Sequence, residues 1–213
     1  MKKKQESIYN LFWIFIVASV CGWFIEGIWT LLKRGVLINH SAVVLGPFNM
    51  AYGISACFLS ALLYKYRNDK LWKIFIVGFI GGSIIEYVMS LGMELLLGFT
   101  AWDYSRKLLN INGRICFAYS IFWGLLSILW IKCVYPYLEK FLKKLNNNKW
   151  YIFSLFLIVF LILDILLTFC AVYRARQKEV GVDAKYKYEI VLDKTFNQDY
   201  LKNMYNNNWG GNR

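Results

Sequence analysis

The stretch "LWKIFIVGFIGGSIIEYVMSLGMELLL", residues 71–97, decides the fold. It is almost entirely apolar, and its only acids are Glu86 and Glu94. A helix needs about 20 mostly apolar residues to cross roughly 30 Å of hydrocarbon. The stretch is therefore long enough to span a membrane, and its two carboxyl groups need an explanation.

Four more apolar runs flank this one, at Ile8–Leu32, Ser41–Tyr64, Ile115–Leu138 and Trp150–Tyr173. None alternates apolar and polar residues with a period of two, which excludes a barrel, so the backbone in lipid has to be helical. The sequence, 58% hydrophobic, predicts an all-α membrane bundle of five transmembrane helices. Gly46 and Pro47 would disturb a helix, so Ser41–Val44 can also be interpreted as loop, which shortens the second span.

The bundle is expected to comprise residues 1–173, with a polar C-terminal tail at 174–213. Within it we expect helical hairpins at about 8–64 and 71–138, and a fifth helix at 150–173. The first run is longer than the roughly 7–15-residue core of a cleavable signal, and no small-residue cleavage site follows it. It is therefore interpreted as an uncleaved first span.

Basic residues indicate the orientation in the cell membrane. Eleven Lys and Arg lie at the N-terminus and in the second and fourth loops, against five in the first and third loops. Because positive residues stay cytoplasmic, the N-terminus is predicted inside, with the loop "AWDYSRKLLNINGRI" (101–115) and the C-terminal tail outside. The net charge of +12 then reflects topology and attraction to anionic lipid, and no nucleic acid is expected as a partner.

Cysteine and histidine usage gives no sign of a metal site. The five cysteines all fall singly inside apolar runs, no CxxC pair occurs, and His40 is the only histidine. We expect buried, inert thiols and no metal or cofactor.

Two weak internal matches suggest a repeat. Ala18, Gly22, Glu26 and Thr30 recur 60 residues later as Gly78, Gly82, Glu86 and Ser90. The segment "GPFNMAYGI" (46–54) also resembles "GRICFAYSI" (113–121), at an offset of 67. Both hairpins would start on the same side, which predicts parallel repeats related by an axis along the membrane normal. The small residues are interpreted mainly as a packing face that lets helices approach closely.

The intramembrane acids define the candidate site. A charge at mid-bilayer costs about 2.5–3.5 kcal/mol, so such residues are kept when paired, protonated or facing water. We expect the 101–115 loop to fold over the outer helix ends, with Arg114 reaching Glu94 or Glu86, and with Asp103, Asn110 and Asn112 holding the loop by turn hydrogen bonds. Trp102 and Tyr104 suit the membrane interface. The predicted outward pocket comprises Glu26, Asn49, Tyr52, Glu86, Glu94, Trp102, Asp103, Tyr104, Asn112, Arg114 and Trp123.

Other interpretations of these acids stay open. The loop can also be a solvated loop with a salt bridge, or part of a catalytic site. Asp164, near the middle of the fifth run, is interpreted as a structural residue whose neutral form bonds to a hydroxyl or backbone group.

Several motifs together resemble a family of bacterial membrane proteins, the type IV permeases of ABC transporters. They are "CGWFIEGIW" (21–29), "GPFNMAYG" (46–53), "GGSIIEYVMSLGMELLLG" (81–98), "WDYS" (102–105) and "NINGRICFAYSIFWG" (110–124). The resemblance covers about 21–136, but proline often stands in the family where Asn49 or Met50 is found here. The positions of this chain that match the family's motifs are Glu26, Gly46, Pro47, Tyr52, Gly53, Glu86, Trp102, Asp103, Tyr104, Asn112, Gly113, Arg114, Trp123 and Gly124.

The resemblance implies transport driven by a separate ATPase subunit. The chain has no GxxxxGK[ST] loop, so nucleotide chemistry would belong to another chain. In this interpretation Glu26 and Glu86 bind a cationic substrate or exchange protons, and a homo-oligomer is expected. The alternatives are a non-enzymatic accessory or interaction protein, and an intramembrane enzyme acting on a lipid through Asp103, Glu86 and Arg114. One histidine and no DDxxD, HExxH or Ser-Lys pattern leave little acid-base equipment for an enzyme.

Overall fold

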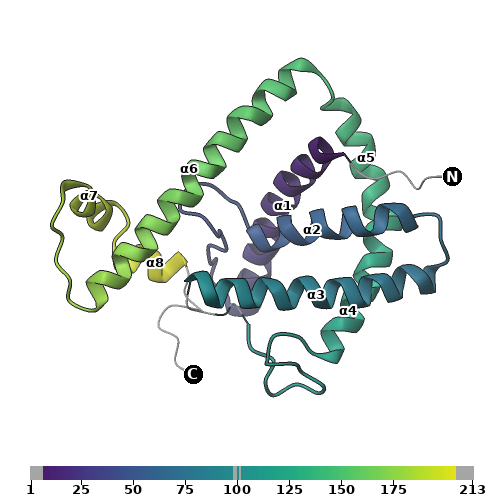
Figure 1. Ribbon diagram of the computed structural model, residues 1–213, viewed down its shortest axis with the longest axis horizontal. Coiled ribbons are helices and arrows are strands. Elements are labelled where there is room, and N and C mark those ends of the chain that lie inside the picture. The colour runs from purple at the N-terminus through teal and green to yellow at the C-terminus, as the bar shows by residue number, and fades with distance from the viewer. Residues whose placement is uncertain (1–6, 98–99, 101, 205–213) are drawn as a thin grey trace. The chain divides into compact units, whose positions relative to one another are not determined.

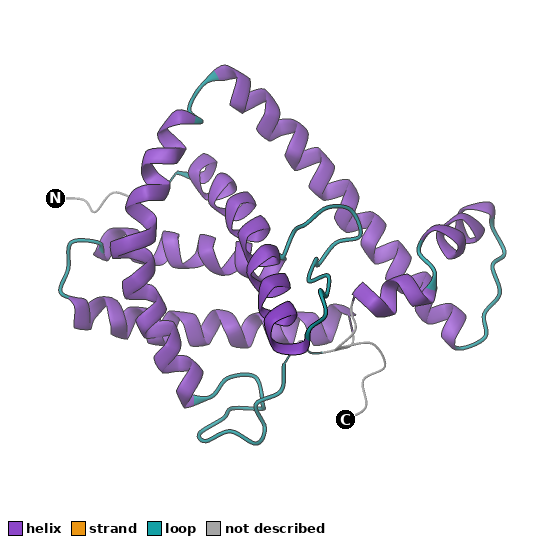
Figure 2. Cartoon of the chain, turned by 180° about the vertical axis from the view of Figure 1, so that it is seen from behind, coloured by secondary structure: helices purple, strands orange, loops and turns teal. Residues whose placement is uncertain are grey.

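The computed structural model describes residues 7–97, 100 and 102–204, and the described chain consists of helices joined by loops (Figures 1 and 2). No strand occurs among these residues apart from one isolated bridge between Ile111 and Ile115. The α-helices are α1 (Ile8–Arg34), α2 (Met50–Leu63), α3 (Leu71–Leu97), α4 (Phe117–Leu129), α5 (Tyr135–Lys144), α6 (Asn148–Glu179), α7 (Lys187–Thr195) and α8 (Gln198–Met204). A 3-10 turn, Tyr64–Tyr66, follows α2, and a π-helical turn, Trp130–Val134, joins α4 to α5.

Four helical segments of the described chain are long and apolar enough to cross a membrane. They are Ile8–Arg34, Leu71–Leu95, Phe117–Lys144 and Asn148–Glu179. The predicted all-helical, multi-pass membrane architecture is therefore confirmed. Lys2, Lys3 and Lys4, which entered the charge count, lie outside the described residues.

The second predicted span is shorter than its apolar run. The helix begins only at Met50, and Ser41–Asn49 form an irregular loop. Gly46 adopts a left-handed φ of 89°, and Pro47 has no N–H to donate. The loop closes on itself instead: the Ala42 N–H donates to the Phe48 carbonyl at 2.8 Å, and the Ser41 hydroxyl donates to the Gly46 carbonyl at 2.6 Å.

The described chain forms two compact units. Unit one takes its described residues from Met1–Ser19 and Met50–Leu145, and unit two from Val20–Asn49 and Asn146–Trp209. In unit one, α4 crosses α3 (Figure 1) at a seam of small residues. A Cβ added at Gly82 would meet Trp123, one added at Gly78 would meet Ser127, and one added at Gly124 would meet Phe75. The glycines therefore allow the close helix approach for which they were singled out.

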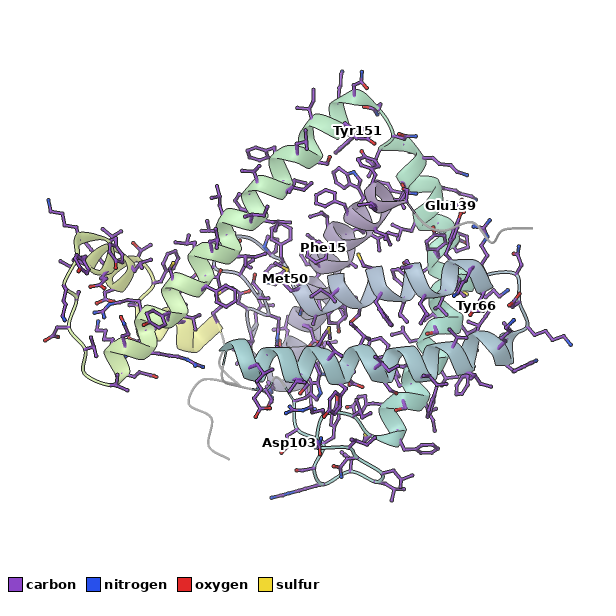
Figure 3. All side chains as sticks on the ribbon, in the orientation of Figure 1. Phe15, Met50, Tyr66, Asp103, Glu139 and Tyr151 are labelled. Carbon is purple, nitrogen blue, oxygen red and sulfur yellow. The ribbon has the colours of Figure 1, made fainter. Side chains whose placement is uncertain are left out.

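In unit one, the start of α1 lies against the end of α5, and the turn after α2 lies against the π-helical turn that precedes α5. The Tyr9 hydroxyl donates to the Leu145 carbonyl at 2.7 Å, and Lys132 Nζ donates to the Arg67 carbonyl at 2.6 Å. Figure 3 shows Tyr66 on the turn after α2 and Glu139 on α5. The chain from α1 to α5 thus returns close to where it began.

In unit two, the 41–48 loop is fastened to α6. The Leu45 N–H donates to Asp164 Oδ1 and the Val44 N–H donates to Thr168 Oγ1, both at 2.9 Å. Asp164 is 1% exposed. It accepts a hydrogen bond from a backbone N–H, one of the two kinds of partner predicted for it, and its neutral form stays a prediction.

The C-terminal tail forms two short helices that pack on α6. Arg174 of α6 donates from Nε and Nη2 to the two carboxylate oxygens of Asp193, each at 2.9 Å. Leu201 of α8 is fully buried in a cluster with Ala171 and Ala175. The Tyr200 hydroxyl donates to the Val44 carbonyl at 3.2 Å, so α8 and the 41–48 loop lie at the same part of α6.

Candidate functional site

The loop between α3 and α4 is held by its own hydrogen bonds. The Tyr104 N–H donates to the Gly113 carbonyl at 2.7 Å, and Trp102 Nε1 donates to the Arg114 carbonyl at 2.9 Å. Asp103, which Figure 3 labels on this loop, accepts from the N–H of Ser105 at 2.9 Å. Asn110 Nδ2 donates to the carbonyls of Ser105 and Lys107. These are turn-type bonds of Asp and Asn, as the sequence predicted.

Backbone conformation gives the loop its sharp return. Leu109, Asn112 and Gly113 have φ values of 51°, 52° and 66°. Gly113 is required for a second reason, because a Cβ there would lie 2.6 Å from Asp103 Oδ1. The glycine therefore permits both the left-handed turn and the close approach of Asp103.

Glu86 lies beneath this loop, on the α4 side of α3. Its side chain is buried, with 5% of its surface exposed. Tyr104 of the loop donates its hydroxyl to Oε1 at 3.1 Å, and Trp123 of α4 donates Nε1 to Oε2 at 2.9 Å. Three of the predicted site residues thus meet at one carboxyl group, whose two hydrogen-bond donors among the described residues are both neutral.

Aromatic rings fix the position of the Tyr104 hydroxyl. The Tyr104 ring stacks on Tyr119 of α4, with centroids 4.5 Å apart, and on Trp102, with centroids 6.5 Å apart. Burial raises the pKa of the Tyr104 phenol well above its usual value, and the negative charge of Glu86 raises it further. The phenol therefore stays protonated at neutral pH and donates to Glu86.

Arg114 pairs with Glu94 rather than with Glu86. Its guanidinium forms an ion pair with the Glu94 carboxylate, donates to Ser90 Oγ at 3.4 Å and lies 5.7 Å from the Tyr87 ring centroid. The hydrogen bond to Glu94 raises the pKa of Arg114. Asn112 was predicted to make a turn hydrogen bond, but its Nδ2 donates to the Tyr87 hydroxyl of α3 at 2.8 Å. Of the two predicted partners of Arg114, Glu94 is the one found.

Three residues of the predicted pocket remain, and two of them belong to the other unit. Glu26 is half-buried on α1, where Thr30 donates its hydroxyl to the Glu26 carbonyl at 3.0 Å. Asn49 precedes α2, and Tyr52 is half-buried within it. Glu26 and Asn49 belong to unit two, and Tyr52 and Glu86 to unit one. That Glu26, Asn49 and Tyr52 share a pocket with Glu86 stays a prediction.

The sequence reasoning missed Tyr87 and Tyr119 as parts of the site. Tyr87 was detectable, because Tyr87, Ser90 and Glu94 follow one another at helical three- and four-residue steps and so share a face of α3. Tyr119 carried no comparable signal. Among the described residues no group of three His, Cys, Asp or Glu side chains could hold a metal ion.

Comparison with known proteins identifies the family. No curated protein and no solved structure is detectably similar to the chain. One family model, described as "Putative ABC-transporter type IV", matches residues 13–169. This match extends beyond both ends of the motif-based resemblance and includes Glu26, Glu86 and Arg114. The chain therefore belongs to the ABC-transporter type IV family of membrane proteins.

Proposed function

We propose that this chain is the membrane-spanning subunit of a transporter and that Glu86 is the acid at the centre of its substrate or proton site. The observation that carries the proposal is a buried carboxyl group on a membrane helix, held by the neutral donors Tyr104 and Trp123. Removing a carboxylate from water is costly unless it is paired or protonated. An acid without a basic hydrogen-bond partner at this depth is suited to exchange a proton or to bind a cation.

Glu94 has a different role in this proposal. Its ion pair with Arg114 lies where the loop meets the end of α3, and it links the loop to that helix. Glu86 is thereby covered by a loop that is attached to α3 through Arg114, Asn112 and Tyr104. A covered site of this kind excludes water until the loop moves.

The full outward pocket would include the second acid, Glu26. The proposal assigns it the residues Glu26, Asn49, Tyr52, Glu86, Glu94, Trp102, Asp103, Tyr104, Asn112, Arg114 and Trp123. It is supported by the matching positions of Glu26 and Glu86 in the two predicted repeats, 60 residues apart. Trp102, Asp103 and Asn112 contribute by holding the loop.

We infer five membrane crossings, with α2 as the short one. Tyr9, at the start of α1, bonds to Leu145, directly after α5. Because these two groups are in contact, they lie on the same side of the membrane. The chain between them therefore crosses the membrane an even number of times. Because α1, α3 and α4–α5 make three, α2 supplies the fourth.

A second contact supports the same count in unit two. Val44 lies before α2, and it bonds to Thr168 in the C-terminal half of α6 and to Tyr200 of α8, which follows α6. If α2, α3, α4–α5 and α6 all cross, the chain makes four crossings and returns to the side on which Val44 lies. If α2 did not cross, the chain would end on the opposite side. The 14 residues of α2 span about 21 Å, so part of the 41–49 loop would lie at membrane depth, where irregular backbone is tolerated when protein groups satisfy it.

The parallel-repeat architecture is part of the proposal. Gly53 of α2 faces Phe15 of α1, and Gly124 of α4 faces Phe75 of α3. Phe15 and Phe75 are separated by the same 60 residues that relate Glu26 to Glu86, whereas Gly53 and Gly124 are 71 residues apart, one helical turn more than the offset of 67 in the sequence match. In both pairs a glycine admits a phenylalanine ring from the preceding long helix, which supports two related hairpins followed by α6 as the extra helix.

The remaining elements follow from the charge count and the family. The N-terminus would be cytoplasmic, with the 102–114 loop and the C-terminal tail outside the cell membrane. The subunit would associate with a separate ATPase and with further copies of itself.

Proton flux in proteoliposomes tests the role of Glu86. A pH-sensitive dye inside the vesicles reports proton uptake under an imposed potassium diffusion potential. We expect uptake by the native chain, its loss in Glu86→Gln, and its retention in Glu139→Gln, a control glutamate on α5 that is paired only loosely with Lys143 at 3.9 Å. Equal flux in the two variants would reject the assignment of Glu86. A chain that moves no protons but co-purifies with a defined partner would favour the accessory interpretation, and lipid conversion without a gradient would favour the enzyme.

A further inference from the structure

Unit one has an apolar groove beside the candidate site. Its volume is about 440 Å³, within the roughly 300–1,000 Å³ of typical ligand pockets. The wall from α3 includes Ile80, Ile84 and Val88, and the opposite wall comes from the loop and the start of α4, including Leu109, Ile111 and Phe117. Glu86 and Trp123 are not among the lining residues, so the groove is a separate feature from the carboxyl site.

The groove opens on a face of α3 that lipid would cover. Ile80, Ile84 and Val88 are each more than half exposed, and Ile76 continues the same stripe one turn earlier. Exposed apolar side chains on a membrane-spanning helix face acyl chains, because the core of the bilayer holds no water. A ligand of the bilayer can therefore enter the groove sideways.

The loop that forms the opposite wall has the composition of a membrane interface. Leu108, Leu109 and Ile111 are 77%, 69% and 54% exposed, and Arg106 and Lys107 directly precede them. Large apolar side chains next to cations are typical of segments that lie at the headgroup boundary. Leu109 also has a left-handed φ of 51°, unusual for leucine, and its side chain lines the groove.

The two cations next to the groove are suited to an anionic headgroup. Arg114 is committed to Glu94, and Asp103 is occupied by Ser105. Arg106 and Lys107 are exposed and form no ion pair within the part of the chain that the structure describes. A phosphate at this level would therefore meet positive charge. The acyl chain below it would meet mainly apolar side chains, together with Tyr87, Cys116 and the Ser83–Ser120 hydroxyl pair.

We propose that this groove binds one acyl chain of an anionic membrane phospholipid, with the headgroup phosphate held by Arg106 and Lys107. The bound lipid would fasten the loop to the outer leaflet and so stabilise the cover over Glu86. The lipid site does not depend on transport, and it would exist equally in an accessory protein.

A photoreactive lipid tests the site. The chain is reconstituted in phosphatidylcholine nanodiscs containing phosphatidylglycerol with a diazirine in the middle of one acyl chain, and the labelled peptides are mapped by mass spectrometry. We expect labelling concentrated in 79–88 and 109–117, competed by phosphatidylglycerol and not by added phosphatidylcholine. Labelling spread evenly over α3 and the exposed face of α6 would overturn the proposal.

Two variants, each with a control, separate the acyl and headgroup parts. Ile84→Trp fills the groove from an exposed position and should abolish the concentrated labelling, whereas Ile76→Trp, on the same stripe but outside the groove, should not. Arg106→Gln with Lys107→Gln should lower the preference for phosphatidylglycerol about tenfold, since basic residues near a membrane attract anionic lipid. Lys185→Gln with Lys187→Gln removes the same charge from the tail and should leave it unchanged. Equal labelling in the two Trp variants, or an unchanged preference in the loop variant, would overturn the proposal.

Discussion

At the scale of single residues, two glutamates on one helix acquire different roles from their neighbours. Glu94 meets a guanidinium and becomes half of an ion pair, whereas Glu86 meets a phenol and an indole. Both neutral donors stabilise a carboxylate without cancelling its charge. The difference between an attachment point and a candidate proton site therefore lies in the donors, since the acids are identical.

Tyr104→Phe should destabilise the protein by removing one donor from the buried Glu86. An unsatisfied buried polar group costs about 1–3 kcal/mol, so the midpoint of thermal unfolding in detergent should fall measurably. Tyr119→Phe is the control, because that ring stacks on Tyr104 while its hydroxyl makes no hydrogen bond among the described residues. Equal midpoints for the two variants would contradict the hydrogen bond to Glu86.

The sequence predicted some of these pairings and missed others for a physical reason. Arg114 and Glu94 could be matched, because a lone cation near the membrane surface seeks one of few acids. Tyr104 was assigned to the interface, and its contact with Glu86 was not anticipated. The direction of its side chain depends on the left-handed residues Leu109, Asn112 and Gly113, a backbone path that composition does not reveal.

At the scale of elements, the 41–49 loop shows where apolar composition misleads. Its residues are as apolar as a helix would require, yet Gly46 and Pro47 oppose helical geometry. The backbone groups that a helix would have satisfied internally are satisfied instead by Asp164 and Thr168 of α6. That exchange depends on a residue more than a hundred positions away, so the local sequence could indicate the break but not its partner.

Thr168→Val should destabilise the attachment of this loop, because it leaves the Val44 N–H without its acceptor. We expect a loss of about 1–3 kcal/mol, measured by denaturant unfolding in detergent. Thr30→Val is a matched control, since Thr30 is equally buried and its hydroxyl bonds only to carbonyls of its own helix. A loss of the same size in both variants would indicate that the hydroxyl of Thr168 has no special role.

Two glycines of α3, one packed against α4 and one in open space, allow a similar comparison within one helix. Gly82→Ala would push a methyl group into Trp123 and should cost about 1–3 kcal/mol by overpacking. Gly92→Ala meets nothing within 4 Å and should instead stabilise α3 by about 0.5–1 kcal/mol, since alanine is the better helix former. Thermal unfolding of the two variants should shift in opposite directions, and a parallel shift would argue against close packing at Gly82.

At the scale of the whole molecule, membrane topology is the property on which the site depends. The family match and the four long helices give a multi-pass protein. The side on which the loop over Glu86 lies follows only if α2 crosses. Charge counting and the Tyr9–Leu145 and Val44–Thr168 contacts point to the same answer by independent routes.

Cysteine accessibility should show Ser7 and Lys65 on the same side of the membrane. In a background with all five cysteines replaced, single cysteines at Ser7, Lys65, Lys107 and Lys185 are treated with a membrane-impermeant maleimide before and after permeabilisation. With five crossings, Lys107 and Lys185 react in intact cells, and Ser7 and Lys65 react only after permeabilisation. If α2 does not cross, Ser7 and Lys65 fall on opposite sides whichever way the chain is inserted. That single pair therefore decides the count, and the reaction at Lys107 then decides whether the loop over Glu86 faces outward.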